Sequence, residues 1–103
     1  MIGFAKAAPY EDRSRYYNGV GEATVYVARE HRGAGAGAEL LAGLVEAARA
    51  RDLHKLTAKV FAGNDASLKL FASAGFRTVG THLRHGRLEG EWLDVVVLER
   101  SLD

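Results

Sequence analysis

The residues with the clearest chemical potential lie in a glycine-rich segment, "REHRGAGAGAELL", that spans residues 29–41. Glycine occupies positions 33, 35 and 37, directly before an alanine- and leucine-rich stretch. Glycine has no Cβ, so it lets an anion approach the main chain closely. At the start of a helix, such a turn presents free backbone N–H groups at the positive end of the helix dipole. The segment therefore predicts a phosphate-binding or diphosphate-binding turn, unless its glycines serve only tight packing at a corner.

Three nucleotide-binding patterns can be compared with this segment. A phosphate-binding P-loop ends in Gly-Lys-Ser/Thr, which is missing here. A dinucleotide fingerprint fits Gly33, Gly35 and Ala38, but the next expected strand ends in "AKVFAG", without the carboxylate that would hold a ribose. The third pattern is R-x-x-G-x-G at Arg32, Gly35 and Gly37, between a strand and a long helix. A nicotinamide-dependent protein is therefore disfavoured.

The elements that must position this segment can be read from the spacing of apolar residues. Leu40, Leu41, Leu44, Val45 and Ala48 recur with helical period, and alternation of apolar and polar residues marks the strands. An Asn64 cap starts a second, shorter helix, and "GRLEG" separates the last two strands. Trp92 is interpreted as a core residue or a pocket wall. The pattern predicts strands over 2–8, 22–28, 54–61, 76–85 and 91–102, and helices over 35–51 and 64–74.

The bulk composition restricts the class of protein. With 103 residues, the chain is expected to form one domain. A net charge of +1 is too balanced to indicate nucleic acid as the main partner. Cysteine is absent, and the four histidines show no metal-ligand spacing, so no metal is expected. No apolar run approaches the ~20 residues that span a bilayer and no signal peptide is visible, so a cytoplasmic location without membrane contact is expected.

Three blocks occur in one order along the chain: "VYVAREHRGAGAGAELL", "FAGNDASLKLFASAGF" and "GEWLDVVVLER". Together they resemble consecutive motifs of the GNAT superfamily of acyl-CoA-dependent N-acetyltransferases, in the branch that acts on phosphinothricin and methionine sulfoximine. The resemblance covers essentially the whole chain. It implies an α/β fold with a single mixed sheet over residues 1–103, in the order β-β-α-β-α-β-β. It also implies acetyl-CoA as co-substrate and the primary amine of a small amino acid or analogue as acceptor.

The resemblance assigns the acyl carrier to three parts of the chain. The glycine turn would cradle the diphosphate, and the strand before it would splay from its neighbour near Val60 and pair with the pantetheine arm, which behaves as a peptide added to a strand edge. Asn64 would hydrogen-bond that arm, or act only as a helix cap. The residues implied in cofactor binding are Val25, Tyr26, Val27, Arg32, Gly33, Ala34, Gly35, Ala36, Gly37, Ala38 and Asn64.

The same resemblance assigns the chemistry. An amine must lose a proton before it attacks a thioester, and Glu22 lies at the matching place for the base. Its alternative role is a solvated charge at a strand end. A backbone N–H of the strand 25–27 would donate to the developing oxyanion. Arg15, Tyr16 and Tyr17 lie in a loop that related enzymes use for the acceptor, where an arginine and aromatics would hold the carboxylate of a small amino acid. An exposed loop with two anchoring tyrosines is an equal alternative.

Two departures from the family pattern raise an alternative function. Phe71 occupies the position where many relatives carry a tyrosine that protonates the leaving sulfur, and Ser67 on the same helix is a substitute or a capping residue. The chain also starts at what would be the family's second or third strand, so it is expected to lack the usual first strand and first two helices. A homodimer would supply the missing wall of the acceptor site. The alternative is a non-catalytic acyl-CoA-binding module.

Overall fold

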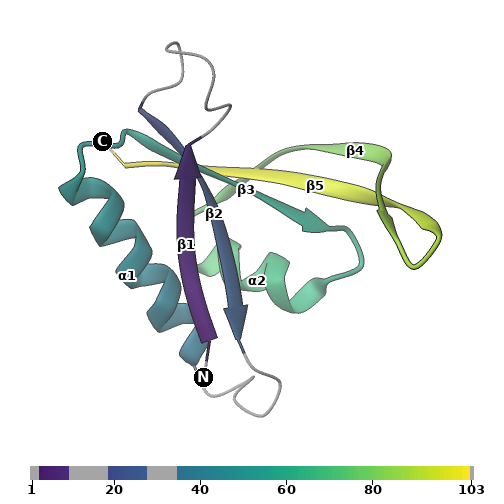
Figure 1. The fold of residues 1–103 in the computed structure, drawn as a ribbon, viewed down its shortest axis with the longest axis horizontal. Helices are drawn as coiled ribbons and strands as arrows, with labels where there is room; N and C mark the ends of the chain where they lie inside the picture. The colour runs from purple at the N-terminus through teal and green to yellow at the C-terminus, as the bar shows by residue number, and fades with distance from the viewer. Residues whose placement is uncertain (1–2, 10–18, 28–34, 103) are drawn as a thin grey trace.

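The computed structural model describes residues 3–9, 19–27 and 35–102 (Figure 1). The elements follow one another in the order that the sequence predicts. Their bounds are β1 Gly3–Pro9, β2 Val20–Val27, α1 Ala36–Ala50, β3 Lys55–Phe61, α2 Asp65–Ser73, β4 Arg77–Leu88 and β5 Glu91–Ser101.

The strands form one mixed sheet of five strands in the order β1-β2-β3-β5-β4. β1 pairs with β2, β3 with β5, and β4 with β5, all antiparallel. β2 and β3 are the parallel pair. Parallel neighbours need a long crossover connection, and α1 lies in the segment that joins these two strands. The predicted α/β fold with a mixed sheet is confirmed.

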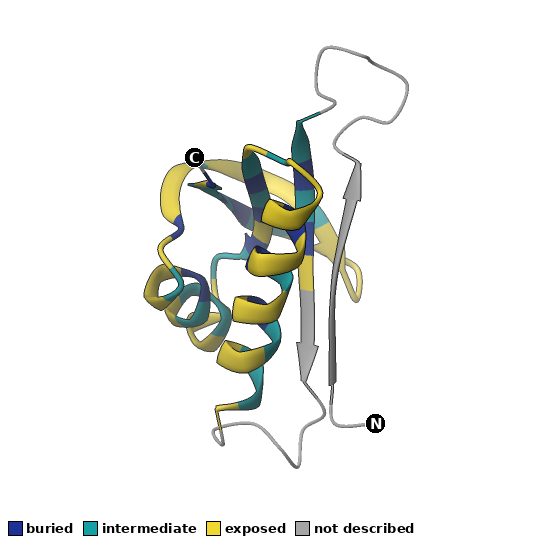
Figure 2. Ribbon diagram, turned by 90° about the vertical axis from the view of Figure 1, so that its left-hand side faces the viewer, coloured by how far each residue is buried: buried dark blue, intermediate teal, exposed yellow. Residues whose placement is uncertain are grey.

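Both helices lie on the same side of the sheet (Figure 2). Leu56, Ala58 and Val60 of β3 are buried, whereas the residues between them are half-buried or exposed. Side chains alternate between the two faces of a strand, so the buried set faces the helices and the other set faces away. The core that joins helices and sheet consists of Ala23, Leu41, Val45, Ala48, Leu56, Ala58, Val60, Phe71, Phe76, Val96, Leu98 and Leu102.

The helices form where the apolar pattern predicts them. Leu41, Val45 and Ala48 of α1 are buried against the sheet. Asn64 caps α2, since its side-chain oxygen accepts a hydrogen bond from the Ser67 N–H at 3.2 Å. Such a cap is worth about 1 kcal/mol. The predicted role of Asn64 as a cap is therefore confirmed.

The terminal hairpin differs from the sequence prediction. β4 continues through Gly86 to Leu88, and the turn is formed by Glu89 and Gly90 at φ values of 50° and 84°. "GRLEG" is therefore mostly strand. Trp92 is 50% exposed and lies under the Arg87 guanidinium at 5.8 Å, so its interpretation as a core residue is wrong. Apolar character predicts burial on average, but hairpin residues beyond the helices have nothing to pack against.

Candidate functional site

The parallel pair of strands is joined over a short distance only. The register of β2 with β3 runs from Val20↔Lys55 to Glu22↔Thr57 and ends there. β2 continues to Val27 beside β1, while β3 continues to Phe61 beside β5. Figure 1 shows the two strands separating from this point. We call residues 23–27 of β2 and 58–61 of β3 the strand fork, and Glu22 lies at its closed end.

The strand fork gives each strand one free edge. Within the part of the chain that the structure describes, residues 23–27 and 58–61 have no register with each other, although each is paired on its outer side. Free strand edges carry backbone N–H and C=O groups that can pair with an added extended chain. The expected separation of the strand Val25–Val27 from its neighbour near Val60 is therefore present. For Val25, Tyr26 and Val27 the structure describes the backbone only.

Both helices begin beyond the open end of the strand fork. α1 starts after β2, and α2 starts after β3, which ends at Phe61. Gly35 precedes α1 at φ 84°, in the left-handed region that favours glycine, and a Cβ there would meet nothing within 4 Å. The first-turn N–H groups of a helix lack partners within the helix. The N–H groups of Ala36, Gly37 and Ala38 in this first turn are therefore available as donors to a ligand.

Glu22 lies on the sheet face that the helices do not cover. Its neighbour Ala23 belongs to the helix-side core, so alternation places Glu22 on the opposite face. Its Oε2 lies 3.8 Å from Nζ of Lys59, and the two side chains are 34% and 52% exposed. A carboxylate at the closed end of the fork is therefore accessible to a ligand.

A second charged group lies on the same face, near the closed end. The Glu99 carboxylate accepts hydrogen bonds from the Arg77 guanidinium and from Lys55, whose Nζ lies at 3.2 Å. The hydrogen bond from Lys55, supported by Arg77, holds the pKa of Glu99 below its ordinary value of 4.5, while partial burial opposes the shift. Glu99 pairs with Thr57 across β5 and β3, so this network is one strand away from Glu22.

Phe71 is a core residue. It is 5% exposed and packs edge-on against Phe76, with ring centres 5.0 Å apart. It carries no hydroxyl, so it supplies no proton donor to the fork. The predicted loss of the family's tyrosine acid is therefore accompanied by a packing role for its replacement. Ser67 provides the backbone N–H that Asn64 caps.

Several predicted site residues lie outside the described residues. They are Arg15, Tyr16 and Tyr17 of the expected acceptor loop, and Arg32, Gly33 and Ala34 of the glycine turn. Of the remaining residues, Glu22 and the backbone of residues 25–27 belong to β2 at the strand fork, whereas Asn64 and the first turn of α1 follow the ends of β3 and β2. Sequence reasoning did not single out Lys59. The alternation of Lys55, Thr57 and Lys59 marks a polar face, but only the fold shows that the Lys59 side chain lies beside Glu22, whose register partner is Thr57.

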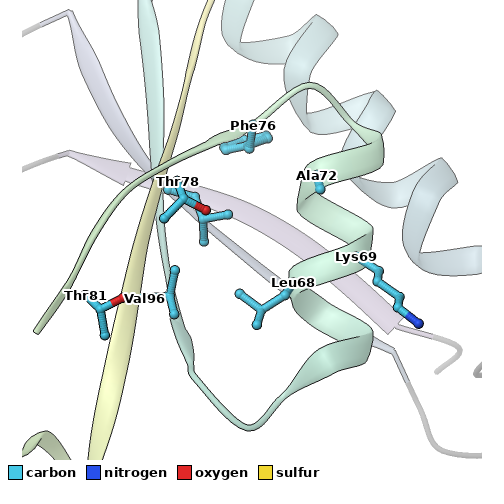
Figure 3. A pocket seen from close by; sticks show the side chains of 8 residues that line it. Leu68, Lys69, Ala72, Phe76, Thr78, Thr81 and Val96 are labelled. Carbon is cyan, nitrogen blue, oxygen red and sulfur yellow. The ribbon is translucent and has the colours of Figure 1, made fainter. Parts of the chain in front are cut away.

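A groove of about 370 Å³ lies elsewhere, between α2 and the strands β4 and β5 (Figure 3). Leu68 and Ala72 of α2 face Thr78 and Val96 across it. The groove is on the helix side of the sheet, whereas Glu22 is on the opposite face. It is therefore separate from the candidate site.

Two kinds of feature are absent from residues 3–9, 19–27 and 35–102. No helix there has the length and apolar character needed to cross a membrane. No group of three or more His, Asp or Glu side chains gathers there as metal ligands would.

The model of the acetyltransferase (GNAT) family matches residues 1–76, and this chain belongs to that family. A phosphinothricin N-acetyltransferase of Streptomyces coelicolor is 42% identical over 99% of this chain. An L-methionine sulfoximine/L-methionine sulfone acetyltransferase of Pseudomonas paraeruginosa is 39% identical over 100% of it. The chain spans 59% of the length of each of these relatives.

The fold is also similar to solved structures. A GNAT superfamily phosphinothricin acetyltransferase from Sinorhizobium meliloti, solved in complex with acetyl-CoA, superposes with a TM-score of 0.91 at 29% identity. The match covers 97% of this chain and 54% of that protein.

Proposed function

We propose that this chain is an acetyl-CoA-dependent N-acetyltransferase that acts on the primary amine of a small amino acid or analogue. The observation that carries the proposal is the strand fork with Glu22 at its closed end. The names of the Streptomyces and Pseudomonas relatives and the acetyl-CoA complex of the Sinorhizobium protein support it. The proposal treats residues 1–103 as one domain of GNAT type and includes the cytoplasmic location expected from the sequence.

The residues of the strand fork fit an acyl carrier of this kind. Backbone groups of Val25, Tyr26 and Val27 on the free edge of β2 would pair with the amides of the pantetheine arm, as in strand addition. The turn from Arg32 to Ala38 would hold the diphosphate with main-chain N–H groups at the start of α1. The Asn64 amide nitrogen would donate to the arm, since its oxygen already serves the α2 cap.

When bound, acetyl-CoA supplies an acetyl thioester. The Glu22 carboxylate would accept the proton of the substrate ammonium, which frees the nitrogen lone pair for attack on the acetyl carbon. A backbone N–H of residues 25–27 would donate to the carbonyl oxygen as it gains charge. The carbon–sulfur bond then breaks, sulfur leaves as thiolate, and the second proton of the attacking nitrogen passes to the thiolate or to solvent, which leaves the neutral amide. A thiol pKa of about 8.5 makes departure without a protonating side chain tolerable, which fits Phe71.

Titration calorimetry and a thiol-release assay test this proposal. We expect the full chain to bind acetyl-CoA and CoA, and to give no heat signal with NAD. We also expect thiol release to accelerate with at least one amino acid from a panel that includes L-methionine sulfone. Binding without accelerated release by any amine would favour the alternative, a non-catalytic acyl-CoA-binding module, to which the hydroxyl-free Phe71 also points. A flat titration with both carriers would reject both.

A homodimer is a further part of the proposal. The exposed large hydrophobic residues of the described chain all lie on the hairpin of β4 and β5: Val79, Leu83, Leu88 and Trp92. β4 is also an edge strand, and exposed edges with apolar side chains favour association. We expect a solution mass of two chains, and a shift toward one chain when Leu83, which is 75% exposed, is replaced by lysine. An unchanged mass in the Leu83→Lys variant would exclude this surface.

A further inference from the structure

Two lysines on the same face of β3 have different surroundings. Lys55 lies 3.2 Å from Glu99, in a network that also includes Arg77. Lys59 lies beside the strand fork, with its Nζ 3.8 Å from the Glu22 carboxylate. The two lysines are four positions apart along the strand, which corresponds to about 13 Å. Only Lys59 therefore lies near the proposed base.

The contact between Lys59 and Glu22 leaves both groups available to a ligand. Its 3.8 Å separation exceeds the range of about 2.7–3.2 Å for an N–H···O hydrogen bond. Pairs between exposed charges contribute little to stability, and these side chains are 52% and 34% exposed. A ligand that carries one positive and one negative charge can therefore take the place of each partner in this ion pair with little loss of folding stability.

An α-amino acid carries the complementary arrangement of charges. Its nitrogen lies about 2.5 Å from its carboxyl carbon, because the two are joined through one Cα. The ammonium can therefore face Glu22 while the carboxylate faces Lys59, and each protein charge exchanges its present partner for one on the ligand. An amine without a carboxylate would satisfy Glu22 and leave Lys59 with no new partner.

We propose that Lys59 binds the α-carboxylate of the acceptor, so that the Glu22–Lys59 pair selects zwitterionic α-amino acids over simple amines. This inference rests on the proposed acetyltransfer function and names the residue that sets its substrate class. The Lys59 ammonium holds the carboxylate, and Glu22 accepts the proton from the neighbouring nitrogen. Lys59 takes no part in bond making or breaking.

Two matched probes test the assignment. L-Methionine sulfone and 3-(methylsulfonyl)propan-1-amine share the same amine and sulfone and differ only in the carboxylate. We expect Lys59→Gln to lower the ratio of kcat/KM for the acid to that for the amine by about 10- to 100-fold, the usual worth of a charged hydrogen bond. Lys55→Gln removes the same charge from the same face and should leave the ratio within about twofold. Lys59→Arg should largely restore it, because it retains a positive charge.

Binding provides a readout that does not depend on turnover. In calorimetry with the CoA-loaded full chain, the Kd for L-methionine sulfone should rise about 10- to 100-fold in Lys59→Gln, while the Kd for the amine stays constant. Equal losses for both probes would mean that Lys59 acts through Glu22 or the fold, and would overturn the assignment. Equal binding of the two probes by the wild type would also overturn it. A wild type that discriminates between the probes in binding but releases no thiol would contradict the proposed function alone.

Discussion

The two ends of the β2–β3 pair differ in what holds them together. At the closed end, Val20 to Glu22 are in register with Lys55 to Thr57, and the fully buried Leu56 faces the helices. On the opposite face, Glu99 connects Lys55 and Arg77 across neighbouring strands. Backbone pairing thus joins β2 to β3 there, while the core and the Glu99 network hold β3 to the helices and to β5 and β4.

The strand fork has fewer of these connections. Its two strands keep their outer partners, but among the described residues no register joins them to each other, and the Lys59 side chain reaches back to Glu22 at 3.8 Å. Free backbone edges have a cost that a folded protein avoids where it can, by pairing or covering them. The closed end is thus the part where the two strands are paired, and the fork is the part available to a ligand. Substitutions at the two ends should therefore change different measurements.

The largest expected effect belongs to Glu22. If it is the base, Glu22→Gln should lower kcat/KM for thiol release by about 10²- to 10⁴-fold, because the amide cannot accept the substrate proton. The melting temperature should change little, since the side chain is partly exposed. Glu46→Gln on the exposed face of α1 is the control with the same chemical change. Equal rates in the two variants would make Glu22 a solvated strand-end charge.

The closed end should respond in stability instead. Leu56 is 0% exposed, so Leu56→Ala should lower the free energy of unfolding by about 2–5 kcal/mol through lost burial and the remaining cavity. Denaturant unfolding measures this change. At a temperature where the variant is folded, its affinity for acetyl-CoA should stay near that of the wild type. A large affinity loss with intact folding would mean that the closed end also shapes the ligand site.

The element order was predictable because each element carries a local signal. The apolar stripe of α1, the Asn64 cap and the alternation along β3 depend on neighbours in the sequence. The turn of the last hairpin was misplaced, because "GRLEG" has two glycines and only Gly90 adopts a positive φ. Gly86 lies inside β4, where a Cβ would approach the Phe61 ring to 2.7 Å. Gly86 thus lacks a side chain because the Phe61 ring packs closely against it. No local sequence pattern reveals this contact.

The candidate site was only partly predictable. The free edges of the strand fork were expected only from the family resemblance. The residue types of β2 and β3 do not indicate where their parallel register ends. Lys59 was missed because its partner Glu22 is distant in the sequence and belongs to a strand joined through α1. Trp92 was misplaced because an isolated aromatic residue does not show whether a helix covers its strand. The point where a strand register ends and the covering of a strand by a helix are both tertiary properties. They can be determined only once the fold is known.

A smaller effect distinguishes two roles of Asn64 at the open end of the fork. Asn64→Ala removes the cap on Ser67 and should cost about 1 kcal/mol of stability. Asn64→Asp keeps an oxygen acceptor for the cap but loses the amide N–H donors. If the amide donates to the pantetheine arm, both variants should bind acetyl-CoA more weakly, while only the alanine variant loses stability. Normal binding by the aspartate variant in calorimetry would reduce Asn64 to a cap.

The smallest expected effect is a pH dependence at the closed end. The folded-state pKa of Glu99 is lower than its ordinary value of 4.5, so the unfolded chain takes up this proton first as the pH falls. The stabilising contribution is therefore complete above the ordinary value and is lost as the pH decreases through it toward the folded-state pKa. Glu99→Gln should remove roughly 0.2–1 kcal/mol of stability at neutral pH, and its unfolding free energy should then decline less than that of the wild type between about pH 5 and pH 3. Parallel declines in the two proteins would show that the Lys55 and Arg77 contacts do not favour the charged form, and the contrast between the closed end and the fork would then depend on backbone pairing and core burial.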